Sequence, residues 1–418
     1  QGGLARGPPP GRLGADTMSF KRPIFVAATR QHIGKTTVSL AIMSGLQKRF
    51  GKVGFIKPVG QQHIAVNDEG SEIRVDKDVQ VMKEYFSLDH LSYRHMSPVI
   101  IPKGYTSRYI DGEESKTRQV EKIKSSYQSV RDASDAVLIE GTGHVGVGSI
   151  VEMSNADVAG LLGADVVLVA NGGLGSAFDE LEMNRLMFAR QGVSVRGVVL
   201  NKVRHDKVDM VREKMAKLLK ERWGVPLLGV VPDLPFLGRF NLRDLEGLLD
   251  AKLLAGHKCR SLHYGMDDAF LITTGLRRFQ RRAFEQRGDW RRPLFVTHIT
   301  RDDLLLGYLA HHLKMMTKQG GQVHGDVNWA GAMVLSVGFS TSFPDSTPHP
   351  DDIEPNSYLM DMVMETDAPV MITNKGTVDT LEAVKNFTAK QNIHDTTRIS
   401  SAIEHYEPHI DFDTMLGA

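Results

Sequence analysis

The sequence predicts an α/β protein in which a mostly parallel sheet carries helices on both faces and a second, smaller α/β domain follows. Three observations predict this fold. Short apolar runs rich in β-branched residues alternate with longer amphipathic stretches over residues 21–240. A second, shorter alternation occupies residues 262–418. The chain has 418 residues, which is too long for one ordinary hydrophobic core.

The predicted strands of the first domain are apolar on both faces, as in a parallel sheet that is covered on both sides. They span residues 24–29, 53–59, 136–141, 165–171, 195–203 and 226–232. The predicted helices lie between them, at residues 35–50, 76–86, 116–132, 176–191 and 206–222. Ligands bind at the carboxyl ends of the strands in such sheets, so polar residues at those ends are candidates for function.

The pattern loosens near residues 240–262, where we place the boundary between the domains. Domain one is assigned to residues 22–245 and domain two to residues 262–412. In domain two we predict strands at 269–275, 293–299, 330–338 and 368–374, and helices around 302–318, 355–366, 376–391 and 394–406. Residues 340–355 are rich in Pro, Asp and Ser, which predicts a loop.

The composition is that of an ordinary soluble globular protein, with 41% hydrophobic and 24% charged residues. The net charge of +1 gives no field that would draw the chain to nucleic acid or to an anionic membrane. The single cysteine, Cys259, excludes an internal disulfide and a thiolate zinc site, and we expect a buried or neutral thiol. No apolar stretch approaches about 18 residues, so no membrane-spanning helix is expected.

Residues 1–20 are rich in Gly, Pro and Arg and lack the apolar core of a secretory signal. We expect a flexible tail over residues 1–21, with Met18 as a candidate natural start. The alternative is the remnant of an organelle-targeting segment, since the stretch is poor in acidic residues and contains arginine. The predicted location is the cytoplasm, or an organelle matrix if the tail is such a remnant.

The most informative stretch is IFVAATRQHIGKTT at residues 24–37, where an apolar run, a short polar loop and Gly-Lys-Thr-Thr follow one another. A strand that turns through a loop into a helix aims free backbone N–H groups at one point, and the helix dipole adds partial positive charge there. Lys35 can reach phosphate oxygens, and the Thr36 hydroxyl can hold Mg²⁺. Thr29 stands where the usual pattern has its first glycine. The stretch predicts a phosphate-binding loop of the P-loop NTPase type; the alternative is a chance Gly-Lys-Thr at a helix start.

Charged and amide side chains end three other predicted strands. Glu140 closes an apolar strand before a glycine-rich turn, where a carboxylate can hold Mg²⁺ directly or through water. Lys57 ends the second strand and could stabilise charge on a transferred phosphoryl group. Asn201 ends another strand, and its amide can pair with the donor and acceptor edges of a purine. The alternative interpretations are a polar strand terminus, a surface lysine and an ordinary turn residue.

Other polar residues give weaker signals. Asp76 and Asp78 begin the predicted helix after the second strand. One of them is expected to cap the helix and the other to contribute to metal binding; we assign Asp76 as the cap and Asp78 to the metal, and the reverse assignment stays open. Thr106 and Ser107 are candidates to line a substrate site. The arginine-rich run at residues 276–293 is interpreted as a solvated face, and its interleaved aromatic residues give the alternative of stacking on a nucleotide or RNA. We expect no nucleic-acid partner.

Several segments together resemble the dethiobiotin-synthetase-like domain. They are FVAATRQHIGKTTVSL, GFIKPVGQ, VDKDVQVMKEYF, LIEGTGH, NADVAGLLGADVVLVANGGLGSAFDEL, GVVLNKV and LLGVVPD. This domain also occurs at the amino end of long bacterial phosphotransacetylases and in cobyrinic acid a,c-diamide synthases. Domain two is similar to the DRTGG domain that follows it in the phosphotransacetylases, on the segments THITRDDLLLGYLAHH, AGAMVLSVG, APVMITNKGTVDTLEAVKNF and RISSAIEHYEPHID. The resemblance covers about residues 22–412.

The resemblance implies roles for individual residues. The family loop has the same displaced glycine, so Thr29 agrees with it. Lys35 matches a position that binds the nucleotide phosphates, Lys57 matches the strand-two lysine that assists phosphoryl transfer, and both are our candidate catalytic residues. The candidate nucleotide contacts are Thr29, His32, Ile33, Gly34, Lys35, Thr36, Thr37, Asn201 and Pro232. The candidate Mg²⁺ ligands are Thr36, Asp78 and Glu140. Thr36 and Glu140 also match metal positions of the family, whereas Asp78 is proposed from its place at the helix start alone.

In the synthetases of this family, ATP phosphorylates a carbamate or carboxylate, and the acyl phosphate is then attacked. We therefore expect a Mg-ATP-binding protein that hydrolyses ATP or activates a small carboxylate or carbamate. The alternative is a non-catalytic nucleotide-sensing regulatory or assembly subunit. The Asn-Lys-Val sequence at Asn201 lacks the Asp of a guanine-selective motif, which favours ATP over GTP. The resemblance also implies a homodimer, whereas the segments 88–113 and 142–150 identify no substrate.

The sequence departs from the phosphotransacetylases in two ways, and each departure limits the function that we expect. The chain ends after domain two, so acetyl transfer to phosphate is not expected. Domain two lacks the Asp-Arg-Thr-Gly-Gly string, and its nearest counterpart is Thr300-Arg301-Asp302-Asp303. Ligand binding by domain two is therefore not predicted.

Overall fold

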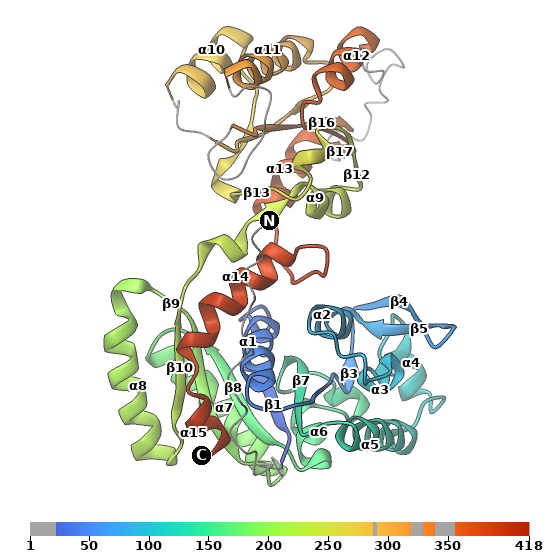
Figure 1. The fold of residues 1–418 in the computed structure, drawn as a ribbon, viewed down its shortest axis with the longest axis vertical. Helices are drawn as coiled ribbons and strands as arrows, with labels where there is room; N and C mark the ends of the chain where they lie inside the picture. Colours follow the sequence, from blue (N-terminus) through green and yellow to red (C-terminus); the bar gives the residue numbers. More distant parts are fainter. Residues whose placement is uncertain (1–21, 287–290, 319–328, 339–355, 418) are drawn as a thin grey trace, which may run out of the picture. The chain divides into compact units, whose positions relative to one another are not determined.

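The computed structural model describes residues 22–286, 291–318, 329–338 and 356–417. The described residues form two compact units (Figure 1). The first unit contains the described residues up to Leu234 and those from Gln391 onward, and the second unit runs from Pro235 to Lys390. The predicted tail at residues 1–21 and the predicted loop at residues 340–355 lie outside the described residues.

The main sheet of the first unit is parallel and has the strand order β10-β9-β8-β1-β7-β2. Its strands are β1 (Ile24–Ala28), β2 (Val53–Ile56), β7 (Ala136–His144), β8 (Asp165–Asn171), β9 (Val195–Val203) and β10 (Leu227–Pro232). β1 and β2 are buried along their whole length. Burial on both faces is what continuous apolar runs require, and the prediction of a covered parallel sheet is confirmed.

The helices of the first unit include α1 (Lys35–Gln47), α2 (Lys77–Tyr85), α3 (Tyr93–Met96), α4 (Tyr105–Ile110), α5 (Lys116–Asp132), α6 (Asn155–Leu162), α7 (Gly175–Arg190) and α8 (Val208–Trp223). The five predicted helices agree with α1, α2, α5, α7 and α8 to within a few residues at each end. The predicted helix at 116–132 has the bounds of α5.

An antiparallel hairpin that the sequence analysis missed leads into α2. It joins β4 (His63–Asp68) to β5 (Ser71–Asp76) through Glu69 and Gly70, which both have positive φ. Two positive φ angles in a two-residue connection are the signature of a tight hairpin turn. A second small pair, β3 (Val59–Gly60) with β6 (Val99–Ile100), also lies here. These short strands are too polar and too brief to stand out in a search for buried strands.

The second unit is built on a five-stranded sheet with the order β12-β17-β16-β15-β14. The four predicted strands correspond to β14 (Ala269–Leu271), β15 (Leu294–His298), β16 (Ala332–Gly338) and β17 (Val370–Gly376), which are mutually parallel. The sequence analysis missed β12 (Ala251–Ala255), which pairs antiparallel with β17.

Helices pack on both sides of this second sheet. Residues of α11 (Asp302–Lys318) and α12 (Ser357–Thr366) share one core with Phe295 and Met333. Residues of α9 (Leu242–Leu249) and α13 (Thr377–Lys385) share the other core with Val296 and Val334. Adjacent strand residues point to opposite faces, so each strand contributes to both cores. The described part of the arginine-rich run forms α10 (Leu276–Gln280) and a π-helix at Arg281–Glu285.

The domain boundaries differ from the predicted ones at both ends of the second unit. α9 belongs to the second unit, because Leu242, Leu245 and Leu249 are buried in its core. The segment from Gln391 returns to the first unit as α14 (Thr396–Tyr406) and α15 (Phe412–Leu416), whereas the sequence analysis placed it in domain two. An amphipathic pattern predicts that a helix is buried on one side, but it does not specify which core receives it.

None of the helices within the described ranges is long and apolar enough to cross a membrane.

Candidate functional site

The loop between β1 and α1 has the backbone of an anion cradle. Gly34 precedes α1 with φ 97°, a left-handed conformation that favours glycine. A Cβ at Gly34 would lie 2.5 Å from Asn201 Nδ2, so this position is also closed sterically to larger residues. No side chain caps the helix N-terminus. The first N–H groups of α1 are therefore available to an anion, and the helix dipole favours negative charge there.

Neighbouring strands and helices hold this loop from outside. The backbone N–H of Thr29 donates to Val169 O at 3.0 Å, and its hydroxyl donates to Glu180 Oε2 at 3.0 Å. Asn201 Nδ2 donates to Ile33 O at 2.6 Å, and Lys202 Nζ donates to His32 O at 2.9 Å. The carbonyls of His32 and Ile33 thus bond to side chains near the carboxyl end of β9, and within the described ranges no side chain caps the first N–H groups of α1.

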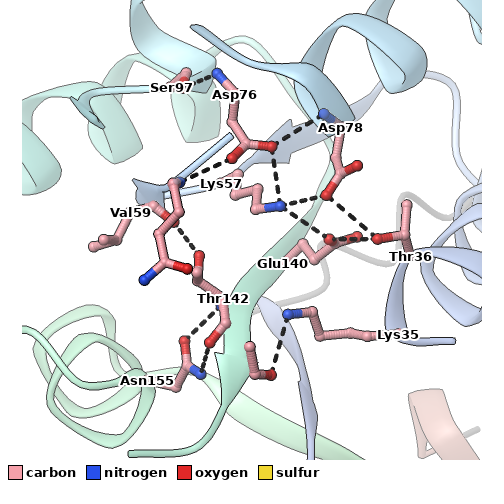
Figure 2. A network of polar contacts seen from close by, with 12 residues as sticks. Lys35, Thr36, Lys57, Val59, Asp76, Asp78, Ser97, Glu140, Thr142 and Asn155 are labelled. Atoms are coloured by element: carbon pink, nitrogen blue, oxygen red, sulfur yellow. Dashed lines mark hydrogen bonds and ion pairs between the residues drawn. The ribbon is translucent and has the colours of Figure 1, made fainter. Parts of the chain in front are cut away.

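A cluster of buried charges lies beside the start of α1 (Figure 2). Lys57 Nζ forms ion pairs with Asp76 Oδ1 at 3.0 Å, with Glu140 Oε1 at 3.5 Å and with Asp78 Oδ2. The Thr36 hydroxyl bonds Glu140 Oε1 at 3.0 Å and lies 3.4 Å from Asp78 Oδ2. One ammonium therefore faces three carboxylates, and the hydroxyl of the phosphate loop joins two of these carboxylates.

Asp76 and Asp78 have different tasks in this cluster. Asp76 is the N-cap of α2, and its Oδ1 accepts from Asp78 N at 3.0 Å. Its Oδ2 accepts from Gln61 N at 3.2 Å. Asp78 turns its carboxylate toward Thr36 and Lys57 (Figure 2). Of the two open assignments, the structure confirms Asp76 as the cap.

The charges of the cluster shift one another's pKa values. Burial works against the charged form of Lys57, but attraction to Asp78, Glu140 and Asp76 outweighs it and raises its pKa. Burial also opposes ionisation of Asp78, yet the charge of Lys57 lowers the pKa of this carboxyl to about 2. Burial and repulsion by Asp78 raise the pKa of Glu140. The cluster therefore holds an ammonium beside at least one firmly ionised carboxylate.

The ammonium of Lys35 has a neutral hydrogen-bond partner, in contrast to the carboxylate partners of Lys57. Its Nζ donates to the backbone oxygen of Gly143 at 3.4 Å. Burial lowers the pKa of this ammonium to about 8, and the charge of Lys57 acts in the same direction. A buried ammonium with only a carbonyl as its hydrogen-bond partner is well suited to receive an anion.

Asn155 is a residue of the site that the sequence analysis missed. It accepts from Thr142 N at 2.8 Å and donates to the carbonyls of Thr142 and His144, each at 2.8 Å. These bonds fix the end of β7, the strand that carries Glu140. A Cβ at Gly141 would lie 2.7 Å from Asn155 Oδ1, so the close approach requires glycine. The capping box formed by Ser154 and Asp157 was the available sequence signal for a helix start here.

The donor set of the cluster fits a magnesium ion that nucleotide and water would complete. Within the described ranges, no group of three or more His, Cys, Asp or Glu side chains has the arrangement of a metal site. Mg²⁺ typically takes only one or two carboxylates and relies on phosphate and water oxygens for the rest. Glu140 Oε2 is buried and forms no hydrogen bond of normal geometry with the residues that the structure describes, so this oxygen is available to a cation.

Three candidate contacts are engaged by the protein itself. Asn201 donates to Ile33 O and accepts from Lys202 N at 2.8 Å, so its amide holds the loop. Pro232 O receives His405 Nε2 at 2.9 Å. Thr37 Oγ1 accepts from Gln391 Nε2 at 3.4 Å. These partners come from distant parts of the chain, and the assignment of Asn201, Pro232 and Thr37 as nucleotide contacts stays a prediction.

Other sequence candidates lie apart from the cluster. Thr106 and Ser107 are on α4, and no hydrogen bond joins them to the charged residues within the described ranges. Cys259 is buried, and burial raises the pKa of its thiol to about 11, as expected of a neutral thiol. In the second unit, Arg301 pairs with Asp303 at 2.9 Å at the start of α11.

The fold and this loop define a P-loop protein: a parallel sheet carries a strand-loop-helix cradle, with a Lys and a Thr at the helix start and a carboxylate on the neighbouring strand. The chain belongs to the AAA domain family AAA_26, whose match covers residues 22–240.

Relatives with known names match different lengths of the chain. ATP-dependent dethiobiotin synthetase from Clostridium perfringens is 27% identical over 239 residues, which is 55% of this chain and 99% of that protein. Phosphate acetyltransferase from Nitratidesulfovibrio vulgaris is 24% identical over 395 residues, which is 93% of this chain and 50% of that protein. Among solved structures, the MinD cell division protein of Aquifex aeolicus is 16% identical, covers 52% of this chain and 84% of its own, and has a TM-score of 0.29.

These matches confirm the resemblance to dethiobiotin synthetases and to phosphotransacetylases. The chain spans about half the length of the phosphate acetyltransferases that it matches. The expectation that it does not transfer acetyl groups stays a prediction, because the other half of those relatives has no counterpart in the matched residues.

Proposed function

We propose that the first unit binds Mg-ATP on the loop from Thr29 to Thr37 and transfers its terminal phosphoryl group to water or to a small carboxylate or carbamate. The observation that carries the proposal is the convergence of Lys35, Thr36, Lys57 and Glu140. Thr36, Lys57 and Glu140 are joined by hydrogen bonds and ion pairs, and the ammonium of Lys35, next to Thr36 in the chain, bonds Gly143 O on the same strand as Glu140 (Figure 2). The similarity to ATP-dependent dethiobiotin synthetases along residues 22–240 supports ATP as the nucleotide.

Different residues of the site would bind the phosphates, hold Mg²⁺ and stabilise the transferred group. The N–H groups at the start of α1 and the Lys35 ammonium would bind the phosphate oxygens. Thr36, Asp78 and Glu140 would hold Mg²⁺, which supplies positive charge against the phosphates when it is bound. Lys57 is kept charged by its carboxylates and would stabilise negative charge on the transferred group.

In the transfer itself, an oxygen of the acceptor forms a bond to the terminal phosphorus while the bond from that phosphorus to the bridging oxygen breaks. ADP leaves with the electron pair. With a carboxylate or carbamate as acceptor the product is an acyl phosphate, and with water it is inorganic phosphate after loss of a proton. Most of the catalysis in such reactions is positioning and charge stabilisation, which the lysines and the loop would provide.

The test is ATP turnover with Mg²⁺ in the wild type, in Lys35→Ala and in Lys52→Ala. Lys52 is an exposed lysine of the same unit and serves as the control. We expect Lys35→Ala to lose most of the turnover and of the nucleotide affinity, and Lys52→Ala to keep both. If the wild type binds nucleotide but its turnover equals that of Lys35→Ala, a nucleotide-sensing subunit replaces the catalytic proposal. Absence of nucleotide binding by the wild type would overturn both.

A further inference from the structure

The C-terminal segment, residues 391–417, packs on the first unit beside the elements that frame the phosphate loop. α14 runs along α1, and α15 lies at β10 (Figure 1). On α1, Ser44 Oγ donates to Glu407 Oε2 at 2.7 Å, and on β10, Asp411 N donates to Leu228 O at 2.8 Å. The segment lies outside residues 22–240, which match the family, so its side chains are not part of the matched domain.

The first residue of this segment, Gln391, reaches the phosphate loop. Its Nε2 donates to Thr37 Oγ1 at 3.4 Å, and Thr37 belongs to the first turn of α1, whose N–H groups form the cradle. Gln391 and Thr37 are each only 9% exposed. The other end of the carboxamide, Gln391 Oε1, is buried and forms no hydrogen bond within the described part of the chain. A buried carbonyl oxygen without a donor costs about 1–3 kcal/mol, so a donor is missing at this place.

Gln391 lies at the end of the cradle that is opposite to the charged cluster. Lys57 follows β2 and Glu140 lies on β7, whereas β9 and β10 are on the other side of β1 in the sheet. A Cβ at Gly34 would lie 2.5 Å from Asn201 Nδ2 on β9 and 3.8 Å from Thr37 Oγ1. The Thr37 hydroxyl, and with it Gln391, is therefore on the β9 side of the loop.

The two ends of a nucleotide would occupy the two sides of this loop. With the terminal phosphate at Lys57, as proposed above, the nucleoside would extend to the side of β9 and Gln391. The phosphates of ATP offer acceptor oxygens, which cannot satisfy a carboxamide oxygen that only accepts. The ribose hydroxyls and the amino group of adenine are donors, so the nucleoside carries the kind of group that Gln391 Oε1 lacks.

We propose that Gln391 is a specificity-determining residue of the nucleotide site: its Oε1 accepts a hydrogen bond from a donor of the nucleoside, either a ribose hydroxyl or the adenine amino group, while its Nε2 stays on Thr37. The inference rests on the proposed nucleotide binding and extends it to the nucleoside. Because Thr37 Oγ1 accepts from Gln391, its own proton can be donated to a phosphate oxygen. One side chain of the C-terminal segment thus connects the loop with the nucleoside.

The first test compares ATP with inorganic tripolyphosphate, which has the phosphates but no nucleoside, by isothermal titration calorimetry on the full chain. Gln391→Met keeps the length of the side chain and removes its polar atoms. We expect this variant to bind ATP about 3- to 10-fold more weakly than the wild type and to bind tripolyphosphate equally well. An equal loss for both ligands would overturn the inference, because Gln391 would then support the loop alone. An unchanged ATP affinity would overturn it as well.

Gln119→Met is the matched control. Gln119 is also a buried glutamine of the first unit, its Nε2 donates to Val151 O at 3.4 Å, and its Oε1 also forms no hydrogen bond among the described residues. It lies on α5, which does not contribute to the phosphate loop. We expect the control to bind both ligands as the wild type does, and an ATP loss equal to that of Gln391→Met would overturn the inference.

The deciding measurement is a cycle between the protein and its ligand, with three analogues that each lack one donor: 2′-deoxyATP, 3′-deoxyATP and purine riboside triphosphate. The wild type should bind one of them about 3- to 10-fold more weakly than ATP, and Gln391→Met should bind that analogue and ATP equally. The analogue concerned identifies the donor. If Gln391→Met retains the discrimination of the wild type for all three, only this inference fails. If the wild type binds neither ATP nor tripolyphosphate, the proposed function fails with it.

Discussion

A single ammonium, that of Lys57, forms ion pairs with three buried carboxylates at the centre of the candidate site. Lys57 is about as buried as its partners, so none of these charges has water to replace a lost neighbour. A buried ion cluster is a costly arrangement for stability alone, and its presence is consistent with a role in chemistry.

Lys57→Met should therefore destabilise the first unit by about 3–5 kcal/mol, because uncompensated carboxylates remain in the interior. Urea denaturation measures this loss, and Lys52→Met, at an exposed lysine, should stay within about 0.5 kcal/mol of the wild type. Mg²⁺ should stabilise the Met variant more than the wild type, since a cation that binds only the folded state shifts the equilibrium toward it. A Met variant as stable as the control would show that the cluster is not buried as described.

Lys35 predicts a pH dependence of nucleotide affinity. Its pKa of about 8 lies below the ordinary lysine value because the folded protein disfavours the buried charge. Bound phosphate favours the charged form, so binding above about pH 8 requires uptake of a proton. ATP affinity of the wild type should fall by up to about tenfold per pH unit as the pH rises through this range.

The pH profile of Lys35→Arg provides the comparison, because a guanidinium stays protonated throughout. Whatever its absolute affinity, this variant should have a flat profile between about pH 7 and pH 10. Isothermal titration calorimetry at several pH values measures both. The same slope in both proteins would assign the pH dependence to another group.

At the scale of elements, the contact between α1 and the C-terminal segment reverses the expected effect of a glycine-to-alanine substitution in a helix. Replacing glycine by alanine inside a helix normally stabilises it by about 0.5–1 kcal/mol. Gly45 lies within α1, but a Cβ there would overlap the Phe412 ring. The guanidinium carbon of Arg49 lies over the same ring, 4.4 Å from its centroid. The ring is thus confined from two sides.

Gly45→Ala should therefore destabilise the protein by about 1–3 kcal/mol, as overpacked cores do. Gly247→Ala in α9 is the matched control, since nothing lies within 4 Å of a Cβ there, and it should stabilise by about 0.5–1 kcal/mol. Chemical denaturation of the two variants measures the opposite signs. Stabilisation by both substitutions would mean that Phe412 does not pack on α1.

Element by element, the sequence predicted the long buried strands and the long helices, and it missed the short or polar ones. The strands β1 and β8 are recognisable because both faces are apolar over five consecutive residues. The hairpin of β4 and β5 and the edge strand β12 are only partly buried, so their apolar residues are few. A local pattern weakens when an element has one face in water and little length.

At the scale of the whole molecule, the first unit is discontinuous in sequence. Its described residues end at Leu234 and resume at Gln391, with the second unit between them. A fragment of residues 22–245, the predicted first domain, would lack the segment that covers Gly45 and pairs with β10 through the antiparallel bridge between Ile410 and Gly229.

We expect this fragment to unfold at a lower temperature than the first unit does in the full chain, because it exposes the apolar surface that Phe412 and Ile410 cover. A synthetic peptide of residues 391–417, added in excess, should raise the melting temperature of the fragment in a concentration-dependent way. Differential scanning calorimetry measures both effects. A peptide of the same composition in scrambled order should do nothing, and equal effects of the two peptides would contradict the prediction.

The sequence by itself determined the strand-loop-helix cradle, the parallel sheet and the position of Lys57 directly after a strand, because these follow from periodicity and from motifs of adjacent residues. Glu140 was predicted to close its strand, but β7 continues to His144 and Glu140 lies in its middle. Only the tertiary structure decided that Asn201 holds the loop, that Asn155 fixes β7 and that residues 391–417 belong to the first unit. Each of these depends on contacts between residues that no local pattern relates. Ile33 and Asn201 are 168 residues apart and Ser44 and Glu407 are 363 apart, and packing alone brings them together.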